Sequence, residues 1–384
     1  MNEAPHRRQP RETTKEQTNM KRITLRIALI ALQAAAACWL AGCAVEGPRA
    51  PVNKPVFPAP PEEAHFVYER SIYGSADVVK EDKNARLKQV LTGEQGRGGE
   101  GLGKPYGVAV YQGRLYVSDT VGHAVAAFDI PKQRYFRIGE EDGGLKRPMG
   151  LDVDGKGNLY VVDGAVKQVQ VYDPDGRHLR SLGGPSSFSR PNGIAVDTAG
   201  SRVYVADTAG VSSMEHRVRV LDARSGAHVL DIGKRCSGPG EFNFPLDVTI
   251  GLDGLLYVVD SGNFRIQVFR PDGTFVRQFG SIGNRGGQFA RPKEVATDPS
   301  GNVYVVDAAF GNFQIFSPEG QLLLAIGSRS ETDGMAKYML PSGIAIDGDG
   351  RIYVADQYFR KVDVYRPAKL AEDAGFTVKP EGKK

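Results

Sequence analysis

The sequence is poor in the residues that build disulfide frameworks and metal centres. Its 384 residues include three cysteines and six histidines. Cys38 and Cys43 belong to an apolar N-terminal segment, so Cys236 is left without a partner for an internal disulfide. No Cys-x-x-Cys-His occurs, which excludes covalent c-type haem. The histidines are too scattered along the chain to predict a zinc site.

Several enzyme motifs and a net charge are also missing. There is no Gly-x-Ser-x-Gly, no His-Glu-x-x-His and no P-loop, since the glycine-rich stretch Gly96–Gly103 lacks the Lys-Ser/Thr ending. The formal charge of +4 arises in residues 1–42, and the rest of the chain has 42 basic and 42 acidic residues. A neutral chain gives no support to a nucleic-acid partner, and none is expected.

The N-terminal segment has the features of a secretory signal. Lys21, Arg22 and Arg26 precede a mostly apolar stretch, Ile27–Leu40, whose 14 residues are too few to span a membrane. The stretch ends in Leu40-Ala41-Gly42-Cys43, which resembles the bacterial lipobox. We therefore expect residues 1–42 to be a signal peptide, with Met20 as an alternative start, and Cys43 to carry the lipid.

A proline-rich segment follows the expected lipid anchor. Residues 43–64 contain six prolines, which favour an extended spacer between anchor and domain. Ala44 does not signal retention in the inner membrane under the usual lipoprotein sorting rule. The expected location is the bacterial cell envelope, lipid-anchored at the outer membrane, on its periplasmic side or at the cell surface.

The chain is dominated by a repeat. The pattern aliphatic-Tyr-Val-x-Asp occurs six times, and its tyrosines are 44, 44, 53, 47 and 49 residues apart. Such a period, with several short strands per unit, predicts a propeller. The units begin at Pro105, Pro148, Pro191, Pro245, Pro292 and Pro341. A large apolar residue three positions before each proline is expected to pack between blades.

The last unit lacks its fourth strand. A similar segment, Phe66–Gly74, lies at the other end of the domain. We predict an all-β, six-bladed propeller over residues 65–367 in which this N-terminal strand completes the sixth blade and removes an open edge. Ser75–Gly93 is predicted to form one short helix, and residues 368–384 a polar tail.

Three segments resemble the NHL repeat: Gly193–Asp197, Gly262–Phe269 and Pro271–Gly280. The Asn-His-Arg-Ile signature reads Asn-Phe-Arg-Ile at 263–266 and is lost in the second unit. The resemblance implies a six-bladed propeller that serves mainly as a binding platform. Some animal members of the family bind RNA, and one related branch is a zinc-dependent amidating lyase.

Departures from the repeat are the best candidates for a site. The six Asp residues of the pattern occur in every unit, so they are expected to be structural acceptors. Each unit continues Pro-x-Gly, except that Asp247 and Glu294 replace the glycine in adjacent units. Together with Asn192 and Lys293 they form a candidate ligand site at the channel mouth. Two carboxylates could hold Ca²⁺; alternatively they cap loop N–H groups or pair with Lys293. No other cofactor is predicted.

Longer loops interrupt the units around the third to fifth blades. They are Thr208–His216, Gly233–Phe244 and Gly327–Leu340. Binding residues tend to lie on such loops. Arg235, Arg285 and Arg329 follow three fourth strands and are candidates for anion contacts, or are simply solvated charges.

Two functional hypotheses follow. The first is a membrane-anchored binding or scaffold lipoprotein that engages a protein or polymer through propeller loops, without enzymatic activity. The alternative is a metal-dependent hydrolase, lactonase or lyase with its site in the central channel. The environment of Asp247 and Glu294 discriminates between them.

Cys43→Ser should move the protein from the membrane fraction to the soluble fraction, because the serine hydroxyl cannot accept the lipid. Fractionation followed by immunoblotting measures this, with Cys236→Ser as the control that stays on the membrane. A Cys43→Ser protein that remains membrane-bound contradicts the lipobox interpretation.

Overall fold

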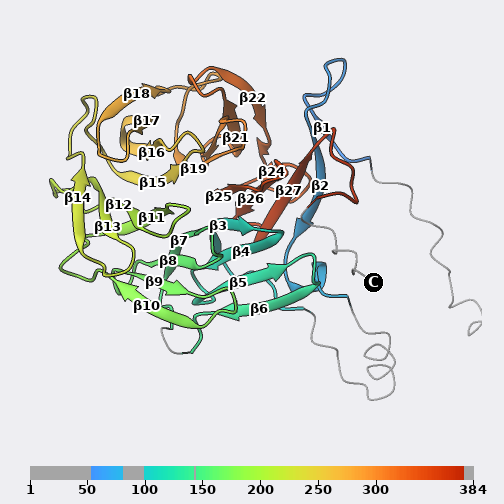
Figure 1. Ribbon diagram of the computed structural model, residues 1–384. Coiled ribbons are helices and arrows are strands. Elements are labelled where there is room, and N and C mark those ends of the chain that lie inside the picture. Colours follow the sequence, from blue (N-terminus) through green and yellow to red (C-terminus); the bar gives the residue numbers. More distant parts are fainter. Residues whose placement is uncertain (1–52, 81–98, 142–143, 376–384) are drawn as a thin grey trace, which may run out of the picture. The chain divides into compact units, whose positions relative to one another are not determined.

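The computed structural model describes residues 53–80, 99–141 and 144–375. They form a six-bladed β-propeller, as predicted (Figure 1). The expected signal peptide and Cys43 lie outside the described residues. In the part of the chain that is described, no helix has the length and apolarity needed to cross a membrane.

Each of the first five blades is a four-stranded antiparallel sheet in chain order. The strands are β3 (Pro105–Tyr111), β4 (Arg114–Asp119), β5 (Ala124–Asp129) and β6 (Arg134–Ile138) in blade 1; β7 (Pro148–Val153), β8 (Leu159–Asp163), β9 (Gln168–Tyr172) and β10 (His178–Leu182) in blade 2; β11 (Pro191–Val196), β12 (Arg202–Asp207), β13 (Arg217–Asp222) and β14 (His228–Ile232) in blade 3; β15 (Pro245–Ile250), β16 (Leu256–Asp260), β17 (Arg265–Phe269) and β18 (Phe275–Phe279) in blade 4; and β19 (Pro292–Thr297), β20 (Val303–Asp307), β21 (Asn312–Phe316) and β22 (Leu322–Ile326) in blade 5.

Blade 6 combines the two ends of the domain. Its sheet runs β1-β2-β27-β26-β25, with β25 (Pro341–Ile346), β26 (Ile352–Asp356) and β27 (Lys361–Pro367) from the C-terminal side. β2 (Phe66–Ile72) pairs with β27, so the predicted closure by the N-terminal strand is confirmed. β1 (Val56–Phe57) adds a fifth strand from within the segment expected to be a spacer.

Few other elements are described. A 3-10 helix, η1 (Ser75–Asp77), occupies the start of the predicted helix, whose residues 81–93 lie outside the described part. A second one, η2 (Ser261–Asn263), follows β16, and β23 (Ser328–Arg329) pairs in parallel with β24 (Lys337–Tyr338).

The second strands are the most buried parts of the ring. All five residues of β8, β16, β20 and β26 are buried, because each sheet packs between two neighbouring sheets. The apolar residues three positions before each proline are buried as well, which confirms their predicted role between blades; they are Leu102, Leu145, Phe188, Phe242, Phe289 and Tyr338.

The aspartate that ends each second strand accepts hydrogen bonds from the backbone of adjoining loops. In blade 1, Asp119 accepts N–H groups of Gly103 and Lys104 at 2.5 and 2.9 Å, and of Val121 and Gly122 at 3.1 and 2.8 Å. We call the six aspartates that end the second strands the clamp aspartates, and Asp119 is the first of them. The others are Asp163, Asp207, Asp260, Asp307 and Asp356, and each accepts at least one N–H from the loop that leads into its blade. Their predicted structural role is confirmed.

Glycine in the Pro-x-Gly pattern allows neighbouring first strands to approach closely. A Cβ on Gly150 would lie 2.7 Å from the Asn192 carbonyl oxygen, and one on Gly193 would lie 2.1 Å from Asp247 Oδ1. Both distances are far below van der Waals contact. A side chain is tolerated only where the next blade leaves room, as it does at Asp247 and Glu294.

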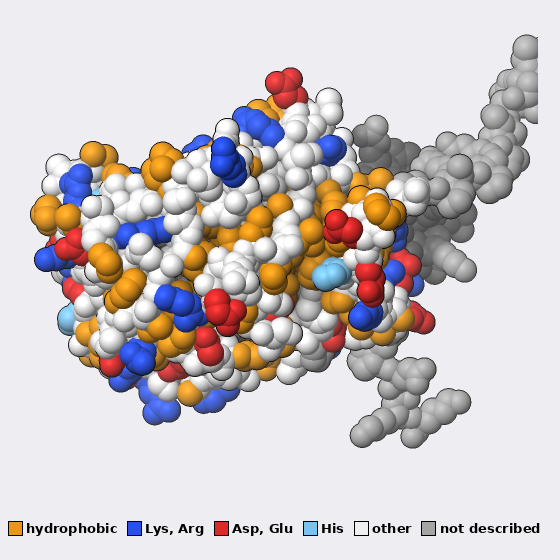
Figure 2. All heavy atoms as spheres, turned by 90° about the horizontal axis from the view of Figure 1, so that it is seen from above, with side chains coloured by type: hydrophobic (Ala, Val, Ile, Leu, Met, Phe, Trp, Pro, Cys, Tyr) orange, Lys and Arg blue, Asp and Glu red, His pale blue; other side chains and the backbone are white. Residues whose placement is uncertain are grey.

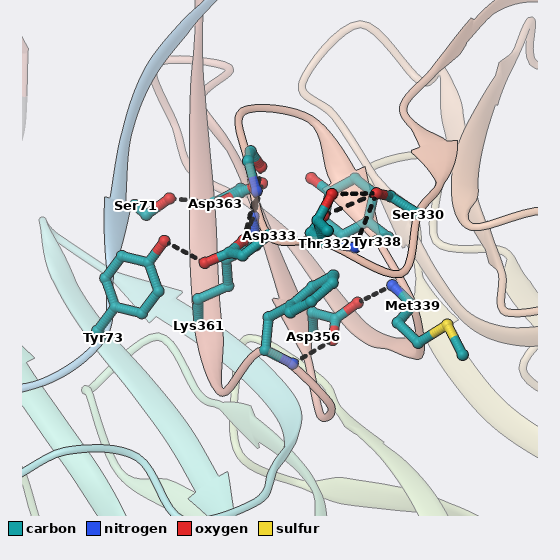
Figure 3. Close-up of polar contacts among 12 residues, drawn as sticks. Ser71, Tyr73, Ser330, Thr332, Asp333, Tyr338, Met339, Asp356, Lys361 and Asp363 are labelled. Atoms are coloured by element: carbon teal, nitrogen blue, oxygen red, sulfur yellow. Dashed lines mark hydrogen bonds and ion pairs between the residues drawn. The ribbon is translucent and has the colours of Figure 1, made fainter.

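A polar cluster around the buried side chains of Lys361 and Asp363 joins the closing strand to blade 6 (Figure 3). Lys361 Nζ is fully buried and forms ion pairs with Asp333 Oδ1 at 2.9 Å and Asp363 Oδ2 at 3.1 Å. From the N-terminal segment, Ser71 Oγ donates to Asp363 Oδ1 at 2.6 Å, and Tyr73 OH donates to Asp333 Oδ2 at 2.7 Å. The lysine therefore joins the two ends of the domain through two carboxylates.

Lys361→Met should destabilise the propeller by about 3–5 kcal/mol, because it leaves Asp363 buried without its cationic partner. Lys337→Met removes an exposed lysine on neighbouring β24 and should cost less than about 1 kcal/mol. Chemical denaturation of both variants measures the difference. Equal stability of the two would show that the cluster does not hold the closing strand.

Candidate functional site

The six first strands surround a narrow central channel. It contains a cavity of about 150 Å³ lined by these strands, including Asp152, Asp247 and Glu294. The Pro-x-Gly segments lie at one mouth. Loops entering the first strands and loops joining second to third strands share this end of the sheets, and we call it the mouth face. The cavity is too small for most organic substrates.

Asp247 and Glu294 both engage the backbone of the following blade. Asp247 Oδ2 accepts the N–H of Val295 at 3.0 Å, and Glu294 Oε1 accepts the N–H of Ile344 at 3.3 Å. The two side chains thus connect blade 4 to blade 5 and blade 5 to blade 6. This arrangement corresponds to the capping role and favours the scaffold hypothesis over the metal-dependent enzyme.

A third channel carboxylate, Asp152, escaped the sequence analysis. Its Oδ2 accepts the N–H of Val196 at 2.8 Å, which connects blade 2 to blade 3 in the same manner. A signal was present in the sequence. Four residues after the first-strand proline, five blades have Ala or Thr, whereas blade 2 has Asp.

Burial keeps these carboxylates from ionising readily. It raises the pKa of Asp152 to about 6 and that of Asp247 to about 7, against the opposing effect of their backbone hydrogen bonds. Burial, together with the nearby Asp247 carboxylate, raises the pKa of Glu294 well above its ordinary value. Around neutral pH the channel therefore carries less negative charge than its three acids suggest.

The other two predicted mouth residues meet through a tyrosine that the sequence analysis did not single out. Tyr106 OH, from blade 1, donates to Asn192 Oδ1 in blade 3 at 2.7 Å. Lys293 Nζ, from blade 5, lies 5.5 Å from the centre of the Tyr106 ring, within cation–π range. Tyr106 occupies the variable position of Pro-x-Gly, as Asn192 and Lys293 do. Alternate blades therefore converge at the mouth.

The structure gives little to a metal ion in the channel. Within the described residues, no group of three or more His, Cys, Asp or Glu side chains is spaced to hold one. Asp247 and Glu294 each already accept a backbone N–H. Calcium ligation by this pair stays a prediction that these contacts do not favour.

The three loop arginines have different environments. Arg235 Nη1 donates to the Ser213 carbonyl at 3.2 Å, which ties it to the long loop of blade 3. Arg329 Nη1 lies 3.4 Å from the Ala309 carbonyl, and Arg285 is exposed. They lie on three separate inter-blade loops, and anion contact by them stays a prediction.

A larger cleft lies away from the mouth. It has a volume of about 640 Å³ and is lined in part by Phe66, Leu323 and Leu324, with turns at 298–302 and 348–350. Those turns join first to second strands, so the cleft opens towards the opposite face. Figure 2, a view from above, shows apolar side chains gathered across the surface with charges scattered among them.

Comparison with known proteins supports the repeat family. Residues 242–269 match the NHL repeat family. The chain is 33% identical over 147 residues to rat peptidylglycine alpha-amidating monooxygenase, covering 34% of this chain and 14% of that protein. It is 35% identical over 104 residues to human NHL repeat-containing protein 3, covering 27% of this chain and 28% of that protein. The chain thus matches less than a third of each relative.

Solved structures agree on the fold. A gluconolactonase from Xanthomonas campestris superposes with a TM-score of 0.52 at 17% identity, covering 69% of this chain and 86% of that one. At this identity the similarity concerns the propeller architecture alone.

The raised pKa values of the channel acids predict that the free energy of unfolding falls as pH rises. A group with a raised folded-state pKa contributes its stability below the unfolded-state pKa, and that contribution is lost as pH rises through the folded-state value. For Asp247 this window extends from about pH 4 to about pH 7. Because an amide cannot ionise, the free energy of unfolding of Asp247→Asn should fall by about 2 kcal/mol less than that of the wild-type protein between about pH 5 and pH 8.

Urea denaturation at a series of pH values measures this slope. Asp175→Asn, which changes an exposed turn carboxylate, should keep the wild-type slope. If Asp247→Asn keeps it too, the buried carboxylate does not titrate as the structure indicates.

Proposed function

We propose that this six-bladed propeller, which carries an NHL repeat, is an extracytoplasmic binding protein. A lipid on Cys43 would anchor it to a bacterial membrane, and the mouth-face loops of blades 3 to 5 would hold another protein. The observation that carries the proposal is a set of exposed apolar side chains on loops that are fixed in place by hydrogen bonds.

The long loop of blade 3 presents two of these side chains. Val211 is 72% exposed and Met214 is 65% exposed. Folding exposes such residues only when nothing in the same chain can cover them, and grouped examples are typical of interaction surfaces. On the loop between blades 4 and 5, which also belongs to the mouth face, Ile282 is 66% exposed. These three residues form what we call the apolar arc.

The loop that carries Val211 and Met214 is held at both ends. The Arg235 N–H donates to the Met214 carbonyl at 3.2 Å, while the His216 ring contacts the Gly210 carbonyl through Nε2 at 3.1 Å. His216 Nδ1 also accepts the N–H of Phe244 at 3.1 Å. A loop ordered before binding loses less conformational entropy when a partner docks. These contacts are therefore more typical of a binding surface than of a flexible loop that is only exposed to solvent.

The composition of the arc favours a protein partner over a polar polymer. Methionine and arginine are enriched in protein interfaces, where apolar contacts lie at the centre and charges at the rim. Here Arg285 is exposed near the apolar arc, on the same loop as Ile282. A polysaccharide would instead call for aromatic platforms and many exposed polar groups.

The enzymatic alternative has weaker support. The gluconolactonase and the amidating monooxygenase show that propellers of related form belong to enzymes. In this chain, however, both candidate carboxylate ligands, Asp247 and Glu294, already accept a backbone N–H, and the cavity is small. No substrate class follows from these residues.

Photo-crosslinking in living cells tests the proposal. A crosslinking amino acid at Met214 should capture a reproducible protein partner, because the side chain would lie within the interface. The matched control is Leu252, which is 78% exposed on the opposite face; a crosslinker there should capture no such partner. Capture of the same proteins from both positions, or of none from Met214, contradicts binding through the arc.

A further inference from the structure

The channel mouth carries a ring of cations. The residue directly before the first-strand proline is basic in four of six blades: Lys104, Arg147, Arg190 and Arg291. All four are exposed. Arg147 Nη2 donates to the Gly164 carbonyl at 2.7 Å. The other three belong to blades 1, 3 and 5, which also supply Tyr106, Asn192 and Lys293. We call Lys104, Arg190, Arg291 and Lys293 the rim cations.

The backbone fixes where the rim cations stand. The N–H groups of Lys104, Arg190 and Arg291 donate to clamp aspartates at 2.9, 2.7 and 3.0 Å, respectively. Their positions at the mouth are thus set by the same bonds that order every blade, while their side chains form no hydrogen bond with any residue that the structure describes. In the described part of the chain, none of the four rim cations forms an ion pair.

The rim cations act on one another. Burial is the largest cause that lowers the pKa of Lys293 to about 8; the positive charges of Arg291 and Lys104 act in the same direction, and Glu294 opposes them. Arg190 is close enough to Tyr106 to counter the rise that burial causes in the pKa of that phenol. Like charges held close together without counter-charges destabilise one another, as Lys104, Arg291 and Lys293 do, and an anion placed between them relieves this repulsion.

The acids beneath the mouth do not supply that counter-charge. Glu294 and Asp247 are buried below the rim, and burial raises their pKa values so that both hold protons well above the ordinary carboxyl range. Each also accepts a backbone N–H from the next blade. Around neutral pH the mouth therefore carries a local positive charge in a chain that is neutral overall.

We propose that the mouth of the channel binds a compact multivalent oxyanion, a ligand bearing phosphate or carboxylate groups that sits between blades 1, 3 and 5. The guanidinium groups of Arg190 and Arg291 suit bidentate contacts to either group. Lys293 would supply a point charge at the centre, over the Tyr106 ring. This site does not depend on the apolar arc.

The geometry favours a small ligand over a polyanionic chain. Nucleic acid and other charged polymers need a stripe of cations along their backbone. Here the cations come from alternate blades to one opening. Of the intervening blades, blades 4 and 6 carry Phe244 and Leu340 at the equivalent position, and in blade 2 the side chain of Arg147 donates to the Gly164 carbonyl. A ligand with two or three anionic groups would match the number and arrangement of the rim cations.

Isothermal titration calorimetry at low ionic strength tests the site with inorganic pyrophosphate and citrate as probes. At least one probe should bind saturably at one site per chain. Arg291→Gln changes an exposed residue whose side chain forms no hydrogen bond or ion pair with the described residues, and should weaken binding by about tenfold, as should Lys293→Gln. Lys337→Gln, on a mouth-face loop away from the rim, should leave affinity unchanged.

Affinity for citrate, whose carboxyl groups are all ionised above about pH 7, should also fall between about pH 7 and pH 9, as Lys293 loses its proton and Asp247 and Glu294 lose theirs. Lys293→Gln should show a smaller fall. Preference for pyrophosphate would identify the ligand as phosphate-bearing, and preference for citrate as a polycarboxylate. Absence of saturable binding by both probes, or an equal loss in Lys337→Gln, would overturn the proposal.

Discussion

The hydrogen bonds of the clamp aspartates are the interaction on which the rest of the structure depends. A propeller blade can form by strand pairing alone, but the conformation of its loops would then not be fixed. The carboxylate at the end of each second strand accepts backbone N–H groups of the loop that enters the blade, as Asp119 does from Gly103 and Lys104. In most blades it also orders the loop that leaves the second strand. The mouth face is therefore assembled from loops that are fixed to the buried centre of each sheet.

Closure is the second constraint. Blade 6 takes its outer strand β2 from the N-terminal side, so the ring is complete only when both ends of the domain meet. Strand pairing supplies part of the join. The buried Lys361, with Asp333 and Asp363, supplies the rest by engaging Ser71 and Tyr73 of the N-terminal segment. Because Lys361 and Asp363 are fully buried, their pairing is conditional on the closed ring.

Both proposed surfaces result from departures from the repeat on a common scaffold. The apolar arc arises where the loop of blade 3 is longer than its equivalents, and the rim cations arise at a position that the repeat leaves free. The channel acids have a different role, since Asp152, Asp247 and Glu294 connect neighbouring blades through backbone N–H groups. A departure from a repeat can thus indicate either a binding site or a residue that connects neighbouring blades.

The sequence by itself determined the number of blades, the closing strand, the buried plug residues and the role of the clamp aspartates. These features recur with the period of the fold, and each recurrence tests the same local rule of burial or hydrogen bonding. The sequence also identified Asp247, Glu294, Asn192 and Lys293 as exceptions at one mouth. Only the tertiary structure decided what those exceptions contact. Three features depend on distances between blades: the direction of the Asp247 side chain, the reach of Tyr106 to Asn192, and the approach of Lys104 and Arg291 to Lys293. Such distances are set by how six separate sheets pack around an axis. They cannot be read from the sequence, because the residues concerned are far apart in the chain and meet only when the ring is closed.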